Sequence, residues 1–205
     1  EKLRYYDEYV KSGEYVKSPC FTHFDKVFNE LSGKTWGIAG LGSIGRRVAD
    51  VAKAFGCRVV YFSASGHTYD TEFKRVSFDE LLENSDIISI HAPLNDKTNN
   101  LFDDAAFAKM KKNAVLLNLG RGPIVNNAAL TKALKENIIA GAGLDVIDKE
   151  PIAADNPLLE IQDSSKLIIT PHIAWATYEA RVRLMDEVYE NIKAFEAGER
   201  RNAVV

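Results

Sequence analysis

Short apolar runs recur along most of the chain, separated by amphipathic stretches. Each run has the length of a strand, and most are rich in valine and isoleucine. Their apolar character is continuous, which is typical of strands buried on both faces of a parallel sheet. The expected strands are Thr35–Ala39, Arg58–Phe62, Ile87–Ile90, Ala114–Leu117, Ala142–Leu144 and Leu167–Ile169.

The stretches between these runs have helical periodicity. Ser77 and Glu80 have the spacing of a capping box, and Gly56 can end the helix that precedes it. Strand and helix alternate six times, which predicts an α/β fold with a doubly wound parallel sheet and right-handed crossovers. The expected helices are Ser43–Phe55, Ser77–Leu82, Asp103–Lys112 and Asn126–Glu136.

The two ends of the chain differ from this regular middle. Residues 1–12 have a helical pattern that stops at Ser12 and Gly13, and an irregular stretch follows as far as Ser32. Tyr178–Ala197 has the pattern of a long amphipathic helix. Two interpretations of this helix are open: it packs on its own domain, or it covers another domain or subunit.

The composition is that of an ordinary globular protein. The chain has 205 residues, 46% of them apolar, and its net charge of −3 argues against a general nucleic-acid or anionic-membrane surface. Cys20 and Cys57 form neither a CxxC pair nor a zinc-ligand set, so we expect no disulfide framework and no metal site. No apolar run approaches the roughly 20 residues of a membrane span. With no signal peptide visible, the cytoplasm is the expected location, although the chain opens on Glu1 and a leader could precede it.

Residues 40–45 match the pattern G-x-G-x-x-G between an expected strand and an expected helix. The pattern alone is weak, but this context is the one that it requires. Gly40 permits the tight turn, Gly42 lets backbone N–H groups approach a pyrophosphate, and Gly45 lets the helix pack on the strand. The helix N-terminus adds unpaired donors and the positive end of a dipole. We expect a dinucleotide-binding loop, with a ligand-free turn as the alternative.

The residue after the second expected strand bears on the choice of coenzyme. An acidic residue there, about 20 positions beyond the glycine loop, would bind the ribose hydroxyls of NAD. Ser63 occupies this place, and without a carboxylate a 2′-phosphate would not be repelled. No arginine lies close by in sequence, only His67, Lys74 and Arg75 further along. NAD and NADP both stay open, with NAD favoured, because Ser63 and Ser65 could bond either a hydroxyl or a phosphate.

Five motifs, in order along nearly the whole chain, carry a resemblance to a known family. They are Gly40–Gly45, His91–Leu94, Leu119–Val125, Leu144–Val146 with Lys149–Pro151, and Thr170–Trp175. Together they resemble the D-isomer-specific 2-hydroxyacid dehydrogenases, which transfer a hydride between NAD(P) and a 2-hydroxy acid or 2-keto acid pair. The segment His172–Thr177 resembles glycerate dehydrogenases, also called hydroxypyruvate reductases. That implies the pairs D-glycerate and hydroxypyruvate, or glycolate and glyoxylate.

The resemblance implies a catalytic set of three residues. Arg121 would bind the substrate carboxylate and polarise the carbonyl, and His172 would exchange a proton with the carbonyl oxygen. Glu150 would orient that ring and favour imidazolium. Without the resemblance these residues could be a surface charge, a structural histidine and a loop carboxylate, and His91 is equally compatible with a core histidine. The implied cofactor-binding residues are Gly40, Gly42, Ser43, Ile44, Gly45, Ser63, His91, Ala92, Pro93, Gly120, Arg121, Asp145, His172 and Ala174.

The family carries a substrate domain before the coenzyme domain, and this chain shows no counterpart to it. The resemblance implies an interdomain helix and connecting segment over residues 1–32, and an NAD(P)-binding Rossmann domain over residues 33–175. It implies that the C-terminal helix, in residues 176–205, returns toward the missing domain. We expect weak or no turnover from this chain alone. The resemblance also implies a homodimer through the coenzyme domain.

Two other functions stay open. C-terminal-binding corepressors share the fold and family and act mainly through partners, so an NAD(H)-sensing, non-catalytic binding module is the alternative to an enzyme. Formate dehydrogenases share the fold too, but that branch lacks a glutamate partner for the histidine, whereas Glu150 is present here. The expected partner is a small-molecule acid, with no nucleic acid and no membrane.

Overall fold

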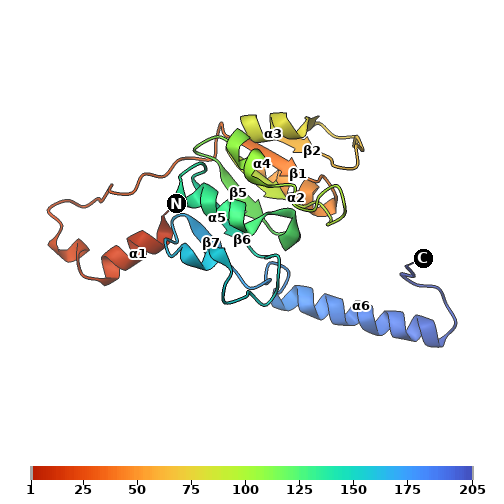
Figure 1. The fold of residues 1–205 in the computed structure, drawn as a ribbon. Coiled ribbons are helices and arrows are strands. Elements are labelled where there is room, and N and C mark those ends of the chain that lie inside the picture. The colour runs from red at the N-terminus through yellow and green to blue at the C-terminus, as the bar shows by residue number, and fades with distance from the viewer. Residues whose placement is uncertain (1, 205) are drawn as a thin grey trace. The chain divides into compact units, whose positions relative to one another are not determined.

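A parallel sheet forms the centre of the computed structural model, which describes residues 2–204 (Figure 1). Within that range the sheet has seven strands in the order β3-β2-β1-β4-β5-β6-β7. All six neighbouring pairs are parallel. The strands are β1 Thr35–Ala39, β2 Arg58–Phe62, β3 Lys74–Arg75, β4 Ile87–Ile90, β5 Val115–Asn118, β6 Gly141–Leu144 and β7 Leu167–Ile169. The expected doubly wound α/β fold is confirmed.

The helices lie within a few residues of their expected bounds. The α-helices are α1 Leu3–Lys11, α2 Ser43–Ala54, α3 Phe78–Asn84, α4 Asp104–Lys109, α5 Asn127–Lys135 and α6 Tyr178–Glu196. Three short 3-10 helices are η1 Tyr15–Lys17, η2 Gly122–Ile124 and η3 Pro157–Glu160. The chain forms two compact units, Glu1–Ile169 with the whole sheet and Thr170–Val205 with α6.

Two elements differ from the expectation. β3 consists of Lys74 and Arg75, both exposed, so no apolar run marks it. It exists because it pairs with β2, with Val60 opposite Lys74. The connection from β6 to β7 carries only η3, so strand and α-helix do not alternate there as expected. Its start at Pro157, capped by Asn156, suits a single turn in a proline-containing loop.

α2 and α3 cover opposite faces of the sheet. Ile38 of β1 is buried in one cluster with Ala49 and Ala52 of α2. A Cβ placed on the neighbouring Gly37 would lie 2.8 Å from Cδ1 of Leu81 in α3. Successive strand residues point to opposite faces, so the two helices sandwich the sheet. Burial on both faces explains why the strands are continuously apolar.

Local side-chain caps fix the starts of α3, α4 and α5, and the sequence predicts the cap of α3. The Ser77 hydroxyl accepts from the Glu80 N–H at 3.1 Å, and Glu80 accepts from the Ser77 N–H at 2.8 Å. Asp103 and Asn126 cap α4 and α5 by a single bond each: their side chains accept from the N–H groups of Ala106 and Ala129. These caps determine where α3, α4 and α5 begin, and therefore which residues remain in the loops that precede them.

The chain reverses its direction of travel across the sheet at β1. It moves outward from β1 to β2 and β3, then returns to place β4 on the other side of β1. In open α/β sheets, ligands bind at such a switch point, outside the carboxyl ends of the strands. The loops after β1, β2, β4, β5 and β6 therefore contain the candidate residues. None of the helices in residues 2–204 has the length and apolar character needed to cross a lipid bilayer.

Candidate functional site

The glycine loop joins β1 to α2 in the conformation that its sequence predicts. Gly40 has a φ of +100°, and a Cβ there would lie 2.6 Å from the backbone nitrogen of Ala92. A Cβ on Gly45 would overlap the carbonyl oxygen of Gly40. A Cβ on Gly42, by contrast, would meet no atom within 4 Å. Two of the glycines are therefore needed for packing, while Gly42 leaves open space above the loop.

That open space lies at the N-terminus of α2. Gly42 is the N-cap residue and offers no side-chain cap, and the first turn has no acidic residue. The N–H groups of the first turn and the positive end of the helix dipole are therefore available to an anion. The orphaned donors and the space at Gly42 fit the pyrophosphate of a dinucleotide.

A cavity of about 420 Å³ follows the carboxyl edge of the sheet beside this loop. It brings together residues from the loops after β1, β4 and β5, which are far apart in sequence. Six of the expected residues line it: Ile44, His91, Ala92, Pro93, Gly120 and Arg121. Leu94 and Leu119 complete the lining and were missed, although both are large apolar residues in polar loops and are partly exposed. Apolar walls of this kind suit the flat faces of an aromatic ligand.

Asn118 positions the Arg121 loop and was also missed. Its side chain is fully buried at the end of β5, where Oδ1 accepts from the Gly120 N–H at 3.1 Å. Its Nδ2 donates to the backbone oxygen of Arg121 at 3.0 Å. The Arg121 guanidinium donates to the Gly120 oxygen at 2.8 Å and is exposed to solvent. A polar residue that ends a buried apolar strand is the signal in the sequence that could have identified Asn118.

Gly122 locks the same loop against the segment that follows β6. A Cβ on Gly122 would overlap the carbonyl group of Ile147 and lie 2.5 Å from the backbone nitrogen of Asp148. In that segment, Asp145 is buried and donates its N–H to the Asn118 oxygen at 2.9 Å. Glu150 Oε1 accepts from the Ile147 N–H at 3.0 Å. The loop of Arg121 and the loop of Asp145 and Glu150 are therefore held as one structure.

His172 and Ala174 belong to the second unit, in the loop that opens it. His172 has a φ of +54°, a left-handed conformation that costs a residue with a Cβ about 1 kcal/mol or more. Its N–H donates to the Thr170 oxygen at 3.0 Å, and its own oxygen accepts from the Trp175 indole at 3.0 Å. These bonds maintain the turn, and backbone outliers of this kind cluster at functional sites.

His91 is held by a short hydrogen-bond chain behind the cavity. The Trp36 indole donates to the Ser89 hydroxyl at 2.9 Å, and this hydroxyl lies 3.1 Å from His91 Nε2. This hydroxyl donates to Nε2 or accepts from it, depending on which ring nitrogen carries the proton. Burial lowers the pKa of His91 below its usual range, so the ring is neutral in the folded protein at neutral pH.

The lowered pKa of His91 makes the stability of the protein depend on pH. As the pH falls below about 6.5, the unfolded chain takes up a proton on His91 that the folded chain does not. We therefore expect this contribution to stability to be complete above that pH and to be lost as the medium becomes more acidic. In urea unfolding, the stability difference between the wild type and His91→Gln should shrink from pH 7.5 to pH 5.0. A difference that stays constant across this range would contradict the assignment.

Ser63 lies beside the glycine loop. The Gly40 N–H donates to the Phe62 oxygen at 2.9 Å, which joins that loop to the end of β2. Ser63 is buried, and its hydroxyl oxygen is 3.1 Å from that of Ser65. Among the described residues, no group of His, Cys, Asp and Glu side chains has the arrangement of a metal site.

The sequence of this chain is similar to a known protein family and to individual enzymes. A family model described as "D-isomer specific 2-hydroxyacid dehydrogenase, NAD binding domain" matches residues 1–174. A glycerate dehydrogenase from Methylorubrum extorquens is 38% identical over 97% of this chain and 62% of its own length. A glyoxylate reductase from Aeropyrum pernix is 41% identical over 94% of this chain and 58% of its own. The chain thus spans about three fifths of the curated relatives that it matches.

A solved structure adds a likeness in three dimensions. The acyclic imino acid reductase Bsp5, in complex with NADPH and D-Arg, superposes with a TM-score of 0.81 and 33% sequence identity. The match covers 97% of this chain and 62% of the reductase. The shared region contains the sheet, the glycine loop and the loops at the carboxyl edge.

Proposed function

Because this chain belongs to the D-isomer specific 2-hydroxyacid dehydrogenase family through its NAD-binding domain, we propose that it serves hydride transfer between a nicotinamide dinucleotide and a D-2-hydroxy acid. The observation that carries the proposal is the cavity at the carboxyl edge, which joins Ile44 of the glycine loop to Arg121. An anion site and a cationic side chain thus border one cavity, as a dinucleotide and an acidic substrate require.

Different residues would bind different parts of the coenzyme. The α2 N-terminus and Gly42 would hold the pyrophosphate, and Ser63 would bond the adenosine ribose. The cavity wall, with Ala92, Pro93 and Gly120, would hold the nicotinamide end. Asp145, whose side chain is buried after β6, would orient the carboxamide. The bound coenzyme supplies or accepts the hydride.

The family resemblance and the chemistry of three side chains support the catalytic roles that we propose. The Arg121 guanidinium would pair with the substrate carboxylate and draw charge toward the carbonyl oxygen as it becomes an alkoxide. His172 would give its ring proton to that oxygen during reduction and take it back during oxidation. Glu150 would favour the protonated ring, since a nearby negative charge stabilises imidazolium.

The substrate pair that we propose is D-glycerate with hydroxypyruvate, or glycolate with glyoxylate. The names of the two relatives and the run His172–Thr177 support it. The test measures oxidation of NADH and of NADPH by the full-length protein, because we expect weak or no turnover from the 205-residue chain alone. The acids are hydroxypyruvate, glyoxylate, pyruvate and phosphohydroxypyruvate. Turnover should be fastest with hydroxypyruvate or glyoxylate. Coenzyme binding without turnover of any acid would favour a coenzyme-sensing module, and absence of both would overturn the proposal.

We also propose a homodimer in the cytoplasm. Apolar side chains between residues 16 and 27 are mostly exposed: Val16 88%, Phe21 86%, Phe24 80% and Val27 79%. Such a concentration on a short segment favours burial against a second copy. Both described thiols, Cys20 and Cys57, are free, which suits a reducing compartment. Sedimentation equilibrium should give twice the monomer mass, and a monomer at micromolar concentration would contradict the dimer.

A further inference from the structure

We propose that Arg75, together with the loop after β2, forms a subsite for the 2′-phosphate of NADP(H). This inference rests on the proposed coenzyme binding and adds a specificity-determining residue to it. The sequence placed Arg75 twelve positions beyond Ser63, too far along the chain to count as a neighbour. In the fold, however, Arg75 contacts the loop that begins at Ser63.

The loop after β2 starts where the adenosine ribose of a bound dinucleotide lies. Gly40 of the glycine loop donates to Phe62 at 2.9 Å, and Ser63 is the next residue. In this fold the side chain at that point contacts the ribose 2′ position, where a carboxylate selects NAD and a cation accommodates the phosphate of NADP. Residues 63–69 contain no carboxylate. The part of the loop nearest Ser63 therefore has no charge that would repel a phosphate, and the carboxylates Asp70 and Glu72 follow further along it.

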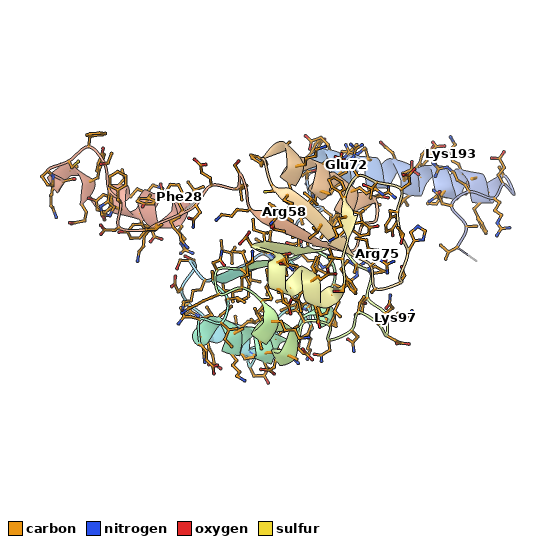
Figure 2. The ribbon with its side chains drawn as sticks, turned by 90° about the horizontal axis from the view of Figure 1, so that it is seen from above. Phe28, Arg58, Glu72, Arg75, Lys97 and Lys193 are labelled. Atoms are coloured by element: carbon orange, nitrogen blue, oxygen red, sulfur yellow. The ribbon has the colours of Figure 1, made fainter. Side chains whose placement is uncertain are left out.

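Arg75 supplies the cation through strand pairing. β3 runs parallel to β2 with Arg75 opposite Tyr61. Arg75 therefore lies at the edge of the sheet, beside the loop that follows β2. Its Nη1 donates to the Thr68 hydroxyl at 3.0 Å. Its Nη2 lies 3.8 Å from the position that a Cβ on Gly66 would take. These contacts anchor the guanidinium on the loop after β2. Figure 2 labels Arg75.

Hydroxyl groups around the guanidinium can complete the subsite. The oxygens of Ser63 and Ser65 are 3.1 Å apart, so one hydroxyl donates to the other and the second hydrogen stays available. The Thr68 oxygen accepts from Arg75 and keeps its own hydrogen to donate. Two hydroxyl hydrogens and an arginine fork are donors of the kind that phosphate oxygens accept.

Arg75 and Arg46 offset the charge of Asp70, which is exposed in the connection between β2 and β3. The carboxylate of Glu72, in the same connection between β2 and β3, pairs with Lys53 at 2.5 Å. The Arg46 guanidinium lies 4.8 Å from the centre of the Tyr69 ring, so a second cation borders the loop from α2. Lys74 precedes Arg75 but points to the other face of the strand, because side chains alternate along a strand.

Direct binding of adenosine fragments tests this inference without catalysis. Calorimetric titration of the purified protein with 2′,5′-ADP and with 5′-AMP isolates the added 2′-phosphate. The wild type should bind 2′,5′-ADP at least about tenfold more tightly, the scale of one charge-assisted contact. Arg75→Gln should reduce that preference by about tenfold, while Arg75→Lys should keep part of it. A Ser63→Asp variant should reverse it, because its carboxylate repels the phosphate and binds the ribose hydroxyls.

Lys74→Gln is the matched control, since it removes the same charge one residue away. It should leave the ratio of the two dissociation constants unchanged. An equal loss in Lys74→Gln and Arg75→Gln, or equal affinity of the wild type for both fragments, would overturn the subsite while leaving coenzyme binding intact. Absence of binding for both fragments and for NADH and NADPH would instead refute the proposed function.

Discussion

Replacing Arg121 by glutamine is expected to lower kcat/KM for hydroxypyruvate or glyoxylate by about a thousandfold. The exposed guanidinium borders the cavity and is the cation placed to meet both the carboxylate and the developing alkoxide. Glutamine keeps a hydrogen-bond donor but loses the positive charge and the paired N–H groups of the guanidinium. Lysine keeps the charge alone, so Arg121→Lys should also lose most of the activity. Steady-state kinetics at saturating coenzyme measures the effect in the full-length wild type and in the two variants made in it.

Arg58→Gln is the control for this substitution. Arg58 begins β2 at the opposite edge of the sheet, where it donates to the Thr35 hydroxyl at 2.7 Å (Figure 2). Its removal should change kcat/KM by less than about threefold. An Arg121→Gln enzyme with activity close to the wild type would show that another group binds the substrate carboxylate.

Gly122→Ala is expected to destabilise the protein by about 3 kcal/mol or more. The new methyl group would overlap the backbone carbonyl of Ile147, and neither backbone segment can move without breaking the bonds that Asn118 makes. The displaced loop would carry Arg121 with it. Urea unfolding gives the change in stability, and the midpoint should fall with the slope unchanged.

Gly120→Ala provides a matched comparison two residues earlier in the same loop. A Cβ there would meet its nearest neighbour, the Ala92 oxygen, at 3.3 Å, which a small adjustment relieves. Its cost should be about 1 kcal/mol or less. Equal costs for the two substitutions would show that general loss of flexibility, and not the fit against Ile147, accounts for the effect.

Local chemistry was enough to predict most of the elements. Five-residue apolar runs predicted β1 and β2 at their observed bounds, because strands buried on both faces carry that pattern in every residue. The capping box predicted the start of α3, since its two hydrogen bonds join residues three apart. The glycine loop was recognisable for the same reason: its turn, its open position and its helix start lie within six consecutive residues.

Local sequence patterns did not predict the contacts between distant segments of the chain. β3 was missed because its two charged residues form a strand only through pairing with β2. Asn118 was missed because the expected strand stopped at Leu117, whereas in the sheet Asn118 pairs with Ile90 of β4 and Leu144 of β6. In both cases the cause is pairing with a neighbouring strand, which a local pattern of side chains does not record.

The sequence by itself determined the parallel α/β fold and the dinucleotide loop, and it supplied the candidates that we propose for the chemistry. Only the tertiary structure decided which of them share a cavity, why Gly122 must have no side chain, and that Arg75 lies on the loop of Ser63. The physical reason is the range of the interactions. Helix caps, turns and burial patterns act over a few residues, whereas the site is assembled by a sheet that aligns the carboxyl ends of strands far apart in the chain.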